Sequence, residues 1–425
     1  MKKKVSGFSI LISALLILTF SSFAEETDVY LSLQIDNPFM TVNGIEVAVD
    51  EGRGTAPLIV DGRTLLPIRT VIESFGGTVS WNGETSAVIL EIGDDKAELI
   101  IGSTSAYYNG AEYTLDVAPQ IINDRTMLPV RFVAESFGLG IAWESDTKTV
   151  HIIRDVFTEE EFERLKSLVP DYSGNAYAVI NGNTPFFNDY ELIDAPFEYY
   201  SPLDEKDRCG VVLASLDEVL MPTEERKSIS SVTPTGWINK PYDFVSGGYL
   251  YNRCHLIGFQ LTGENANTRN LITGTRYMNV DGMLVFENQV ADYVKANDER
   301  VMYRVTPVFS GNDNVALGVL MEAYSSGDEE FKICVFCYNL QPGVLINYKT
   351  GESRIINEGE DIYDFGNMEK SEVDTITEEV ENLVYRTANG KRYHVIMTCG
   401  GSKSYGVSLE DAVASGLTPC DKCAK

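Results

Sequence analysis

Residues 251–287 read YNRCHLIGFQLTGENANTRNLITGTRYMNVDGMLVFE, and this stretch decides how the middle of the chain folds. It contains His255, one of only three histidines in the chain, and an imidazole can take a proton from water near neutral pH. Asn279 and Glu287 follow where an Asn-, Thr- and Gly-rich loop turns into a predicted helix. An amide oxygen and a nearby carboxylate suit a hard cation such as Mg²⁺. The stretch therefore contains the parts of a site for metal-assisted phosphodiester hydrolysis.

The order of these residues resembles that of the sugar-non-specific DNA/RNA endonucleases with a ββα-metal finger. The family signature is Asp-Arg-Gly-His, followed by an asparagine that binds one Mg²⁺ and then by a glutamate on a helix. Here Asn252-Arg253-Cys254-His255 stands at the signature, Asn279 at the metal-binding asparagine and Glu287 at the glutamate. Two signature positions depart from the family, with Asn252 for Asp and Cys254 for Gly, and both bear on how His255 is held. The sequence Thr-Gly-Thr-Arg-Tyr-Met-Asn is similar to that of secreted DNases of Gram-positive bacteria.

A purely structural interpretation of the same residues also exists. A histidine beside Leu256 and Ile257 is often a core residue, and Asn/Thr/Gly runs are usually loops. The ordered set of His255, Asn270, Asn279 and Glu287, which includes a second asparagine as the family does, favours the catalytic interpretation.

The resemblance implies a role for each residue. His255 would be the general base, Asn279 would bind Mg²⁺ directly, and Glu287 would orient the waters of the ion. The family also places arginines on the phosphate, and Arg226 and Arg253 are the candidates here, with Arg276 ranked behind them. A plain surface charge is the alternative for each arginine. Contacts limited to phosphate, sugar and metal carry no sequence information, so cleavage should be non-specific, with DNA favoured over RNA.

The charge of the chain opposes simple nucleic-acid binding. The formal net charge is -29 at pH 7, whereas tight, static, sequence-specific binding to DNA depends on a basic surface. An enzyme that must release its product is compatible with this charge, provided that Mg²⁺ and a few arginines neutralise the phosphate locally.

Residues 1–24 have the three parts of a secretory signal peptide. Lys2 to Lys4 are basic, Phe8 to Phe20 are apolar, and Ser22-Phe23-Ala24 fits a cleavage site. An uncleaved anchor is the alternative, although the apolar run is short for a spanning helix. No later segment approaches about 20 apolar residues, so we expect no transmembrane segment in the mature chain and a secreted, extracellular protein that could associate with the cell wall.

An internal repeat precedes the nuclease-like stretch. Residues 56–69, APLIVDGRTLLPIR, recur as residues 118–131, APQIINDRTMLPVR, and each copy continues to Glu-Ser-Phe-Gly and then to Trp81 or Trp143. Asn43-Gly44 and Asn109-Gly110 are predicted hairpin turns. The pattern resembles the copper amine oxidase N-terminal-like stalk domain of secreted bacterial proteins. With one histidine and no cysteine in this region, we expect a spacer or an envelope-binding module and not a copper site.

The C-terminal segment contains four metal-ligand side chains in two pairs, His394 with Cys399 and Cys420 with Cys423. Three thiolates and an imidazole can fill a tetrahedral structural zinc site, and a segment this short needs more than a hydrophobic core to fold. It resembles small zinc-ribbon-like tails on other secreted nucleases. A disulfide with one free thiol is the alternative.

The remaining cysteines lie in the middle of the chain. Cys334 and Cys337 fall in an apolar strand pattern, where residues three apart point to opposite faces, so we expect buried thiols and not a redox pair. Cys209 and Cys254 could pair, and the sequence leaves that open.

Together these patterns predict a multidomain α+β protein. Its parts would be a signal peptide (1–24), a β-rich stalk domain with two internal repeats (28–155), a helical connector opened by a capping box at Thr158 (156–171), a mixed α+β nuclease domain with a ββα-metal motif (172–356), an acidic linker (357–382) and a small zinc-binding module (383–425).

Two functions of other classes remain alternatives to a secreted nuclease. One is a non-catalytic cell-surface binding protein on a nuclease scaffold, which the intact His255 and Asn279 argue against. The other is an antibacterial nuclease toxin, which a neighbouring immunity gene would indicate.

Overall fold

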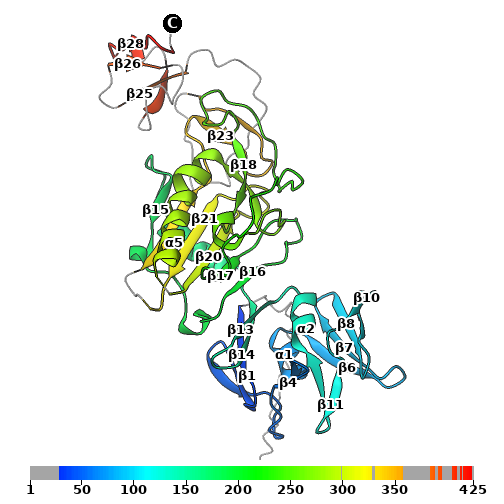
Figure 1. The fold of residues 1–425 in the computed structure, drawn as a ribbon. Coiled ribbons are helices and arrows are strands. Elements are labelled where there is room, and N and C mark those ends of the chain that lie inside the picture. The colour runs from blue at the N-terminus through cyan, green and yellow to red at the C-terminus, as the bar shows by residue number, and fades with distance from the viewer. Residues whose placement is uncertain are drawn as a thin grey trace, which may run out of the picture.

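The computed structural model describes residues 28–297, 299–327, 331–357, 383–387, 391–394, 404–408, 412–413 and 415–423. The predicted signal peptide and most of the predicted acidic linker lie outside these ranges. No helix in the described residues is long and apolar enough to cross a membrane. Figure 1 shows a blue-to-cyan N-terminal part, a green-to-yellow middle part and short red strands near the C-terminus.

The N-terminal domain, residues 28–155, consists of three antiparallel sheets and two short helices. The sheet orders are β13-β14-β1-β2-β3, β10-β9-β8-β7-β6 and β11-β12-β5-β4. The element bounds are β1 Val29–Gln34, β2 Phe39–Val42, β3 Ile45–Ala48, β4 Leu58–Val60, β5 Arg63–Pro67, α1 Ile68–Ser74, β6 Thr78–Asn82, β7 Ala87–Ile92, β8 Asp95–Ile100, β9 Ser105–Tyr108, β10 Ala111–Thr114, β11 Gln120–Ile122, β12 Arg125–Pro129, α2 Val130–Ser136, β13 Gly140–Glu144 and β14 Thr149–Arg154.

The two sequence repeats fold into the same unit. The first forms β4, β5, α1 and β6, and the second forms β11, β12, α2 and β13. Strands β5 and β12 pair antiparallel, with Leu66 opposite Leu128. Apolar helix residues of both repeats, such as Ile72 and Val133, enter one shared core. The repeats therefore complete each other, because neither could bury its apolar face alone.

Both predicted hairpin turns are present. Asn43-Gly44 joins β2 to β3, and Asn109-Gly110 joins β9 to β10. All four residues have positive φ, at 48° and 76° in the first turn and 48° and 82° in the second. Positive φ at both central residues is the type I′ geometry that Asn-Gly favours, because it matches the twist of the strands.

Helix α3, Glu159–Leu168, begins at the predicted capping box. The Thr158 hydroxyl accepts from the backbone N–H of Glu161 at 3.3 Å, and the Glu161 carboxylate accepts from the backbone N–H of Thr158 at 2.9 Å. Leu165 and Val169 enter the hydrophobic core of the middle domain. The connector is thus packed onto the nuclease-like part of the chain.

The middle domain, residues 172–356, is built on a six-stranded antiparallel sheet of order β15-β22-β21-β20-β17-β16. The bounds of its elements are β15 Tyr177–Val179, η1 Asn181–Asn183, η2 Asp189–Glu191, β16 Phe197–Tyr200, β17 Val212–Leu216, β18 Tyr251–His255, α4 Phe259–Thr262, β19 Leu271–Thr275, η3 Met278–Met283, α5 Leu284–Ala296, β20 Val301–Val308, β21 Gly318–Tyr324, β22 Lys332–Tyr338, β23 Val344–Ile346 and β24 Ser353–Ile355.

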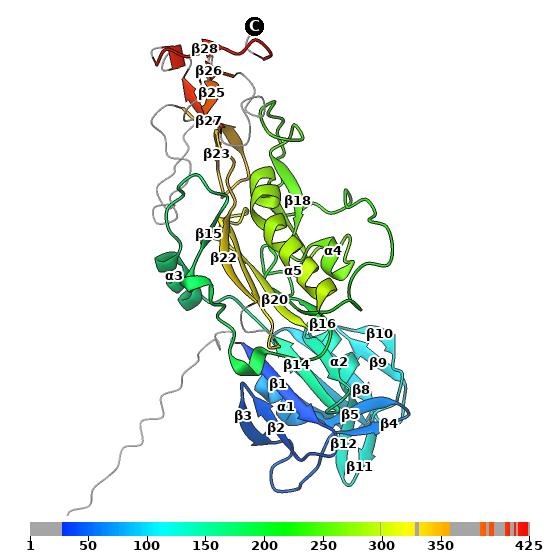
Figure 2. The ribbon, with the colours of Figure 1, turned by 60° about the vertical axis from the view of Figure 1, so that its left-hand side comes forward.

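The two faces of this sheet support separate cores. Cys337 packs with α5 residues such as Val290 on one face, and Cys334 packs with Leu165 of α3 on the other. Figure 2 shows α5 and α3 on opposite sides of the sheet. Both cysteines are buried free thiols, as their spacing predicted. Cys209 and Cys254 are also free, so the pairing that the sequence left open is not formed.

The helix after β19 begins where the sequence predicted it, whereas the strand that leads to His255 is shifted along the chain. We expected a helix from about residue 275, and helical structure begins at Arg276, directly after β19. We expected a strand at 248–251, whereas β18 begins at Tyr251 and ends on His255 itself. The Thr275 N–H donates to Asn339 Oδ1 at 2.8 Å, and its Oγ accepts from the Met278 N–H at 3.1 Å. Thr275 therefore ends the strand and caps the helix that follows.

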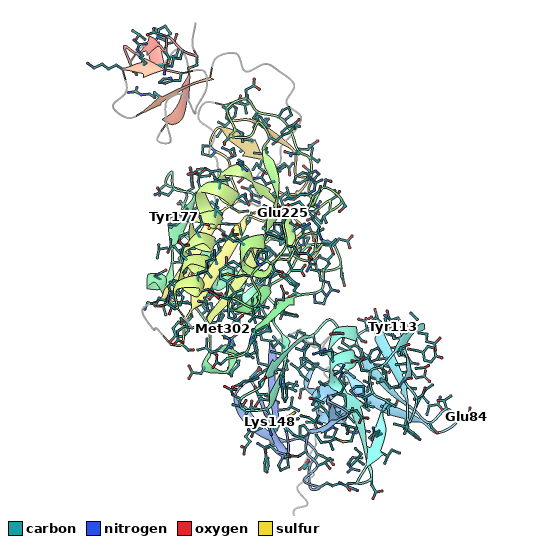
Figure 3. The ribbon with its side chains drawn as sticks, viewed as in Figure 1. Glu84, Tyr113, Lys148, Tyr177, Glu225 and Met302 are labelled. Atoms are coloured by element: carbon teal, nitrogen blue, oxygen red, sulfur yellow. The ribbon has the colours of Figure 1, made fainter. Side chains whose placement is uncertain are left out.

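The N-terminal and middle domains share a buried interface. Strand β13 contacts β16, and Tyr30 and Ile153 form one apolar cluster with Tyr199 and Met302. Met302, labelled in Figure 3, lies at this junction. At Gly140 a Cβ would come within 3.0 Å of the Tyr199 ring. The two domains meet too closely there for a larger residue.

A buried ionic cluster crosses the same interface. Arg304 contacts Glu322 at 2.8 Å and Glu191 at 3.1 Å from the middle domain, and Asp155 at 3.4 Å from the N-terminal domain. Tyr30 donates a hydrogen bond to Asp155. Burial raises the pKa of Asp155, and the Arg304 guanidinium opposes that shift. Removing one partner would leave charge uncompensated in the interior.

We predict that Asp155→Ala lowers the free energy of unfolding by about 3 kcal/mol, because Arg304 and Tyr30 each lose a buried partner. The exposed Asp146→Ala is the matched control and should stay within about 0.5 kcal/mol of the native chain. Urea denaturation followed by circular dichroism measures both. Equal free energies of unfolding for the two variants would contradict the proposed contribution of this cluster to stability.

Candidate active site

An open cleft in the middle domain brings the predicted site residues together. Its volume is about 620 Å³. The residues predicted from the sequence that line it are His255, Glu287, Arg226, Arg253, Arg276 and Asn279. Among its lining residues there are three arginines and a single carboxylate. The cleft is therefore locally cationic although the chain is strongly acidic, which removes the main electrostatic objection to a nucleic-acid substrate.

Strand pairing between β18 and β19 positions His255 opposite Leu271 at the end of the hairpin. The chain that follows His255 is held by Asn270, which is completely buried. Asn270 Oδ1 accepts from the Ile257 N–H at 2.9 Å, and its amide group donates to the Ile257 carbonyl at 3.0 Å. Asn270 therefore has a positioning role in the loop behind the histidine.

The hydrogen bonds of His255 determine which ring nitrogen is basic. Nε2 lies 2.8 Å from the backbone carbonyl oxygen of Asn265. A carbonyl can only accept, so Nε2 carries the proton and Nδ1 offers the lone pair. Arg226 Nη2 donates to Nδ1 at 3.3 Å. Burial lowers the pKa of His255 below 6.5, and the Arg226 charge acts in the same direction. A neutral imidazole at pH 7 is the form that a general base requires.

Asn279 lies in the π-helical turn Met278–Met283, immediately before α5. Its Oδ1 accepts a hydrogen bond from the Cys254 thiol at 2.9 Å. Burial raises the pKa of Cys254 well above its ordinary value, so the thiol keeps its proton and can donate. Cys254 stands where the family signature has glycine, and here it orients the asparagine. Single π-turns within helices often occur at functional sites.

Glu287 projects from α5 to the floor of the same cleft. Burial raises its pKa to about 7, and the nearby Arg226 opposes the shift. A Cβ on Gly258 would lie 2.6 Å from Glu287 Oε2. The glycine therefore leaves the space that the carboxylate occupies.

The three arginines of the cleft differ in their partners. Arg226 contacts His255, as described above. Arg253 donates to the backbone carbonyls of Val232 and Ser230 and stacks over Trp237 at 4.4 Å. These bonds tie the loop before β18 to the strand, which suits a positioning role better than the phosphate contact expected from the sequence.

Arg276, which the sequence ranked last, has the strongest structural signal of the three. Its Nε is buried without a hydrogen-bond partner, and so is Nδ2 of Asn252 on β18, which lines the same cleft. A buried donor without a partner is costly, so these two groups mark a position where a ligand would accept hydrogen bonds. Sequence reasoning also missed Trp237, Asn239 and Tyr249 as cleft residues, because they precede the motif and carry no spacing signal.

The donor set of the cleft fits a hard divalent cation. An amide oxygen has two lone pairs, and the Cys254 thiol occupies only one of those on Asn279 Oδ1. The Glu287 carboxylate lines the same cleft. Oxygen ligands of this kind suit Mg²⁺, which keeps most of its waters.

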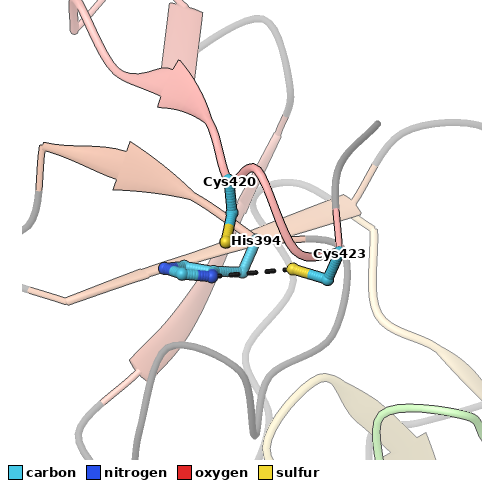
Figure 4. Close-up of side chains that lie close together, drawn as sticks. All are labelled: His394, Cys420 and Cys423. Atoms are coloured by element: carbon cyan, nitrogen blue, oxygen red, sulfur yellow. Dashed lines mark hydrogen bonds between the residues drawn. The ribbon is translucent and has the colours of Figure 1, made fainter.

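A second cluster of metal-ligand side chains lies near the C-terminus. His394, Cys420 and Cys423 place their ligand atoms within 4.8 Å of one another, and Cys423 Sγ is 3.6 Å from His394 Nδ1. Figure 4 shows the three side chains converging. His394 follows β26 (Arg392–Tyr393), which pairs in parallel with β28 (Thr418–Pro419), while β25 (Leu383–Thr387) pairs with β27 (Ser404–Ser408). Cys399, the fourth predicted ligand, lies outside the described residues.

Comparison with known proteins assigns two parts of the chain to families. Residues 190–327 match the DNA/RNA non-specific endonuclease family, and these residues include the whole cleft motif from Arg226 to Glu287. The middle domain is a DNA/RNA non-specific endonuclease domain. Residues 42–152 match the copper amine oxidase N-terminal domain, as the repeat predicted.

Similar solved structures and one curated relative were also found. NucA from Streptococcus agalactiae with bound magnesium is 24% identical, over 47% of this chain and 97% of that chain, with a TM-score of 0.41. The Sda1 nuclease with bound zinc is 26% identical, over 38% of this chain and 82% of that chain, with a TM-score of 0.35. A protease inhibitor from Brevibacillus choshinensis is 33% identical over 86 residues, which is 20% of this chain. The chain spans about a quarter (26%) of that relative's length.

We predict that the His255 imidazole titrates below its ordinary pKa of 6.5, because burial and the Arg226 charge both disfavour the imidazolium. Arg226→Met should move this titration to higher pH, since it removes a positive charge. The exposed Arg269→Met is the matched control and should leave the titration in place. Nuclear magnetic resonance of the histidine ring measures it separately from Glu287, whose pKa burial raises to about 7. A His255 titration that Arg226→Met leaves unmoved would contradict the assignment.

Proposed function

We propose that this protein is a secreted, Mg²⁺-dependent, sequence-non-specific endonuclease that hydrolyses phosphodiester bonds of DNA and also accepts RNA. The observation that carries the proposal is the fixed tautomer of His255, whose basic Nδ1 lies in one cleft with Asn279. The hairpin of β18 and β19 and the helix after it would then act as a ββα-metal motif.

His255 Nδ1 would take a proton from the attacking water, while the Asn265 carbonyl holds the ring in position through Nε2–H. Arg226 and Arg276 would bind the phosphate, and Arg226 would leave His255 for the phosphate when the substrate enters. Asn279 would hold Mg²⁺, with Glu287 orienting its waters, and the ion when bound would stabilise the added charge on the phosphate. Contacts of this kind read the backbone and not the bases, so cleavage would not depend on the base sequence.

We predict that His255→Ala lowers the rate of plasmid cleavage at least about a hundredfold, because it removes the general base. Asn279→Ala should raise the Mg²⁺ concentration needed for half-maximal rate. Gln289→Ala, which changes an exposed residue of α5, is the control. The assay incubates plasmid or RNA with each variant in the presence of Mg²⁺ or of EDTA. A cleavage rate of His255→Ala within about tenfold of the native rate would rule out His255 as the general base.

We propose further that His394, Cys399, Cys420 and Cys423 bind one structural zinc ion that takes no part in cleavage. What supports this is the convergence of three of the four side chains. Three thiolates and an imidazole would leave no open coordination position for a substrate water.

The full chain should therefore contain one zinc ion, which Cys420→Ser and Cys423→Ser should lose. Lys422→Ala, between the two cysteines, is the control and should retain it. Elemental analysis of the purified variants measures the zinc, and plasmid assays should give nuclease rates within about twofold of each other. A disulfide between Cys420 and Cys423 in mass spectrometry would overturn the zinc proposal.

Export and a cell-wall role complete the proposed function. Residues 1–24 support export as a cleavable signal peptide. N-terminal sequencing of protein recovered from the medium tests this, and a chain that still begins at Met1 would contradict it. The N-terminal domain would hold the enzyme at the envelope. The assigned endonuclease domain makes a non-catalytic surface protein a weaker alternative, and nothing favours the antibacterial toxin specifically.

A further inference from the structure

The N-terminal domain contains two open grooves, one beside each repeat. Groove A, of about 460 Å³, includes Trp81 and is formed by α1 and β6 of the first repeat together with Arg125 of the second. Groove B, of about 540 Å³, includes Trp143 and is formed by α2 and β13 of the second repeat together with Arg63 of the first. Each groove is thus completed by the hairpin of the other repeat.

The two grooves use equivalent positions of the repeats. In each, one helix supplies an arginine and a glutamate and the following strand supplies the tryptophan, so the corresponding sets are Arg69, Glu73 and Trp81 in groove A and Arg131, Glu135 and Trp143 in groove B. On the opposite wall of each groove, an arginine of the other repeat forms a salt bridge with an aspartate. The distance from the arginine Nε to the aspartate Oδ2 is 2.6 Å for Arg125 and Asp50 in groove A and 2.7 Å for Arg63 and Asp116 in groove B. The domain therefore presents the same arrangement of side chains twice.

The indoles in these grooves are accessible. Trp81 is 52% exposed and Trp143 is 36% exposed, although a tryptophan usually buries most of its surface. Groove B has a further aromatic wall, where the rings of Tyr113 and Phe132 are 6.0 Å apart. Tyr113 is labelled in Figure 3 at the outer edge of the domain. An exposed aromatic face between charged hydrogen-bonding groups suits a ligand with one apolar face and a polar rim.

Sugars have this chemistry. A pyranose ring with equatorial substituents exposes a flat C–H face, whose positive hydrogens pack on the negative face of an indole. Its rim carries hydroxyl groups that can both accept from an arginine and donate to a carboxylate. Each groove offers both kinds of partner within reach of the tryptophan, with Arg131 and Glu135 beside Trp143 and Arg69 and Glu73 beside Trp81.

The charges of the grooves argue against a second nucleic-acid site. Groove B has two arginines and two carboxylates, and groove A has two arginines against Asp50, Glu51, Glu73 and Asp124. A phosphate backbone requires a clear excess of positive charge, as the active-site cleft has. A neutral ligand encounters no such penalty in either groove.

We propose that the two grooves are equivalent binding sites for neutral pyranose units of a linear, β-1,4-linked polysaccharide. This inference gives the proposed envelope role of the N-terminal domain a site and a ligand class, and it does not depend on cleavage by the middle domain. Two separated sites on one domain suit a repeating polymer, because the second contact is made at a high effective concentration.

The test uses the full chain and two soluble probes, chitohexaose and cellohexaose, in isothermal titration calorimetry. We expect at least one probe to bind with a stoichiometry of two per chain. Trp81→Ala and Trp143→Ala should each reduce the stoichiometry to one, and the double variant should bind at least about tenfold more weakly at both grooves. Ile45→Ala, an exposed apolar side chain of the same domain outside the grooves, is the control. Plasmid cleavage should be unchanged in all variants, which separates this test from that of the nuclease.

Three results would overturn the proposal. The first is that neither oligosaccharide binds the native chain. The second is binding that survives in the double variant, which would put the site elsewhere. The third is that the two tryptophan substitutions instead abolish binding of single-stranded oligo(dT) or self-association in analytical ultracentrifugation, which would assign the grooves to nucleic acid or to a second copy of the chain.

Discussion

The antiparallel pairing of β18 with β19 is the constraint on which the active-site cleft depends. It brings His255 to the end of one strand and leads the other strand directly into the helix that carries Asn279 and Glu287. The loop between the strands then returns Asn265, whose carbonyl fixes the tautomer of the histidine. A one-residue slip in this register would turn His255 to the opposite face of the hairpin. The chemistry of the cleft therefore follows from backbone hydrogen bonds.

The same hairpin explains how the chain tolerates its departures from the family signature. Cys254 has replaced glycine, and its thiol binds Asn279 at 2.9 Å. The space for that side chain comes from Gly274 on the paired strand, where a Cβ would lie 2.6 Å from the Cys254 Cβ. Gly274 therefore leaves the space that the Cys254 side chain occupies. Asn252, the second departure, lines the cleft with an amide in place of a carboxylate, and its buried Nδ2 has no hydrogen-bond partner.

Much of this organisation could be predicted from the sequence because it rests on local patterns. The Asn-Gly turns, the capping box at Thr158 and the opposite faces of Cys334 and Cys337 each follow from a rule about neighbouring residues. The cleft residues His255, Asn279 and Glu287 were found because a motif preserves their order. The hydrogen bond between Thr275 and Asn339 could not be predicted, because it joins residues far apart in the sequence. The docking of the N-terminal domain through Arg304 and the hydrogen bonds of Arg253 to the backbone of Val232 and Ser230 escaped for the same reason.

The central claim is that one cleft holds the base, the metal and the phosphate together. Anomalous diffraction from crystals of His255→Ala grown with Mn²⁺ and a short DNA duplex tests it most directly, because uncleaved substrate and ion are then located at once. The predicted result is one Mn²⁺ ion with Asn279 Oδ1 and a phosphate oxygen among its ligands, and with Arg276 donating to the same phosphate. DNA bound outside the cleft, or Mn²⁺ in the cleft without contact to Asn279, would contradict the claim.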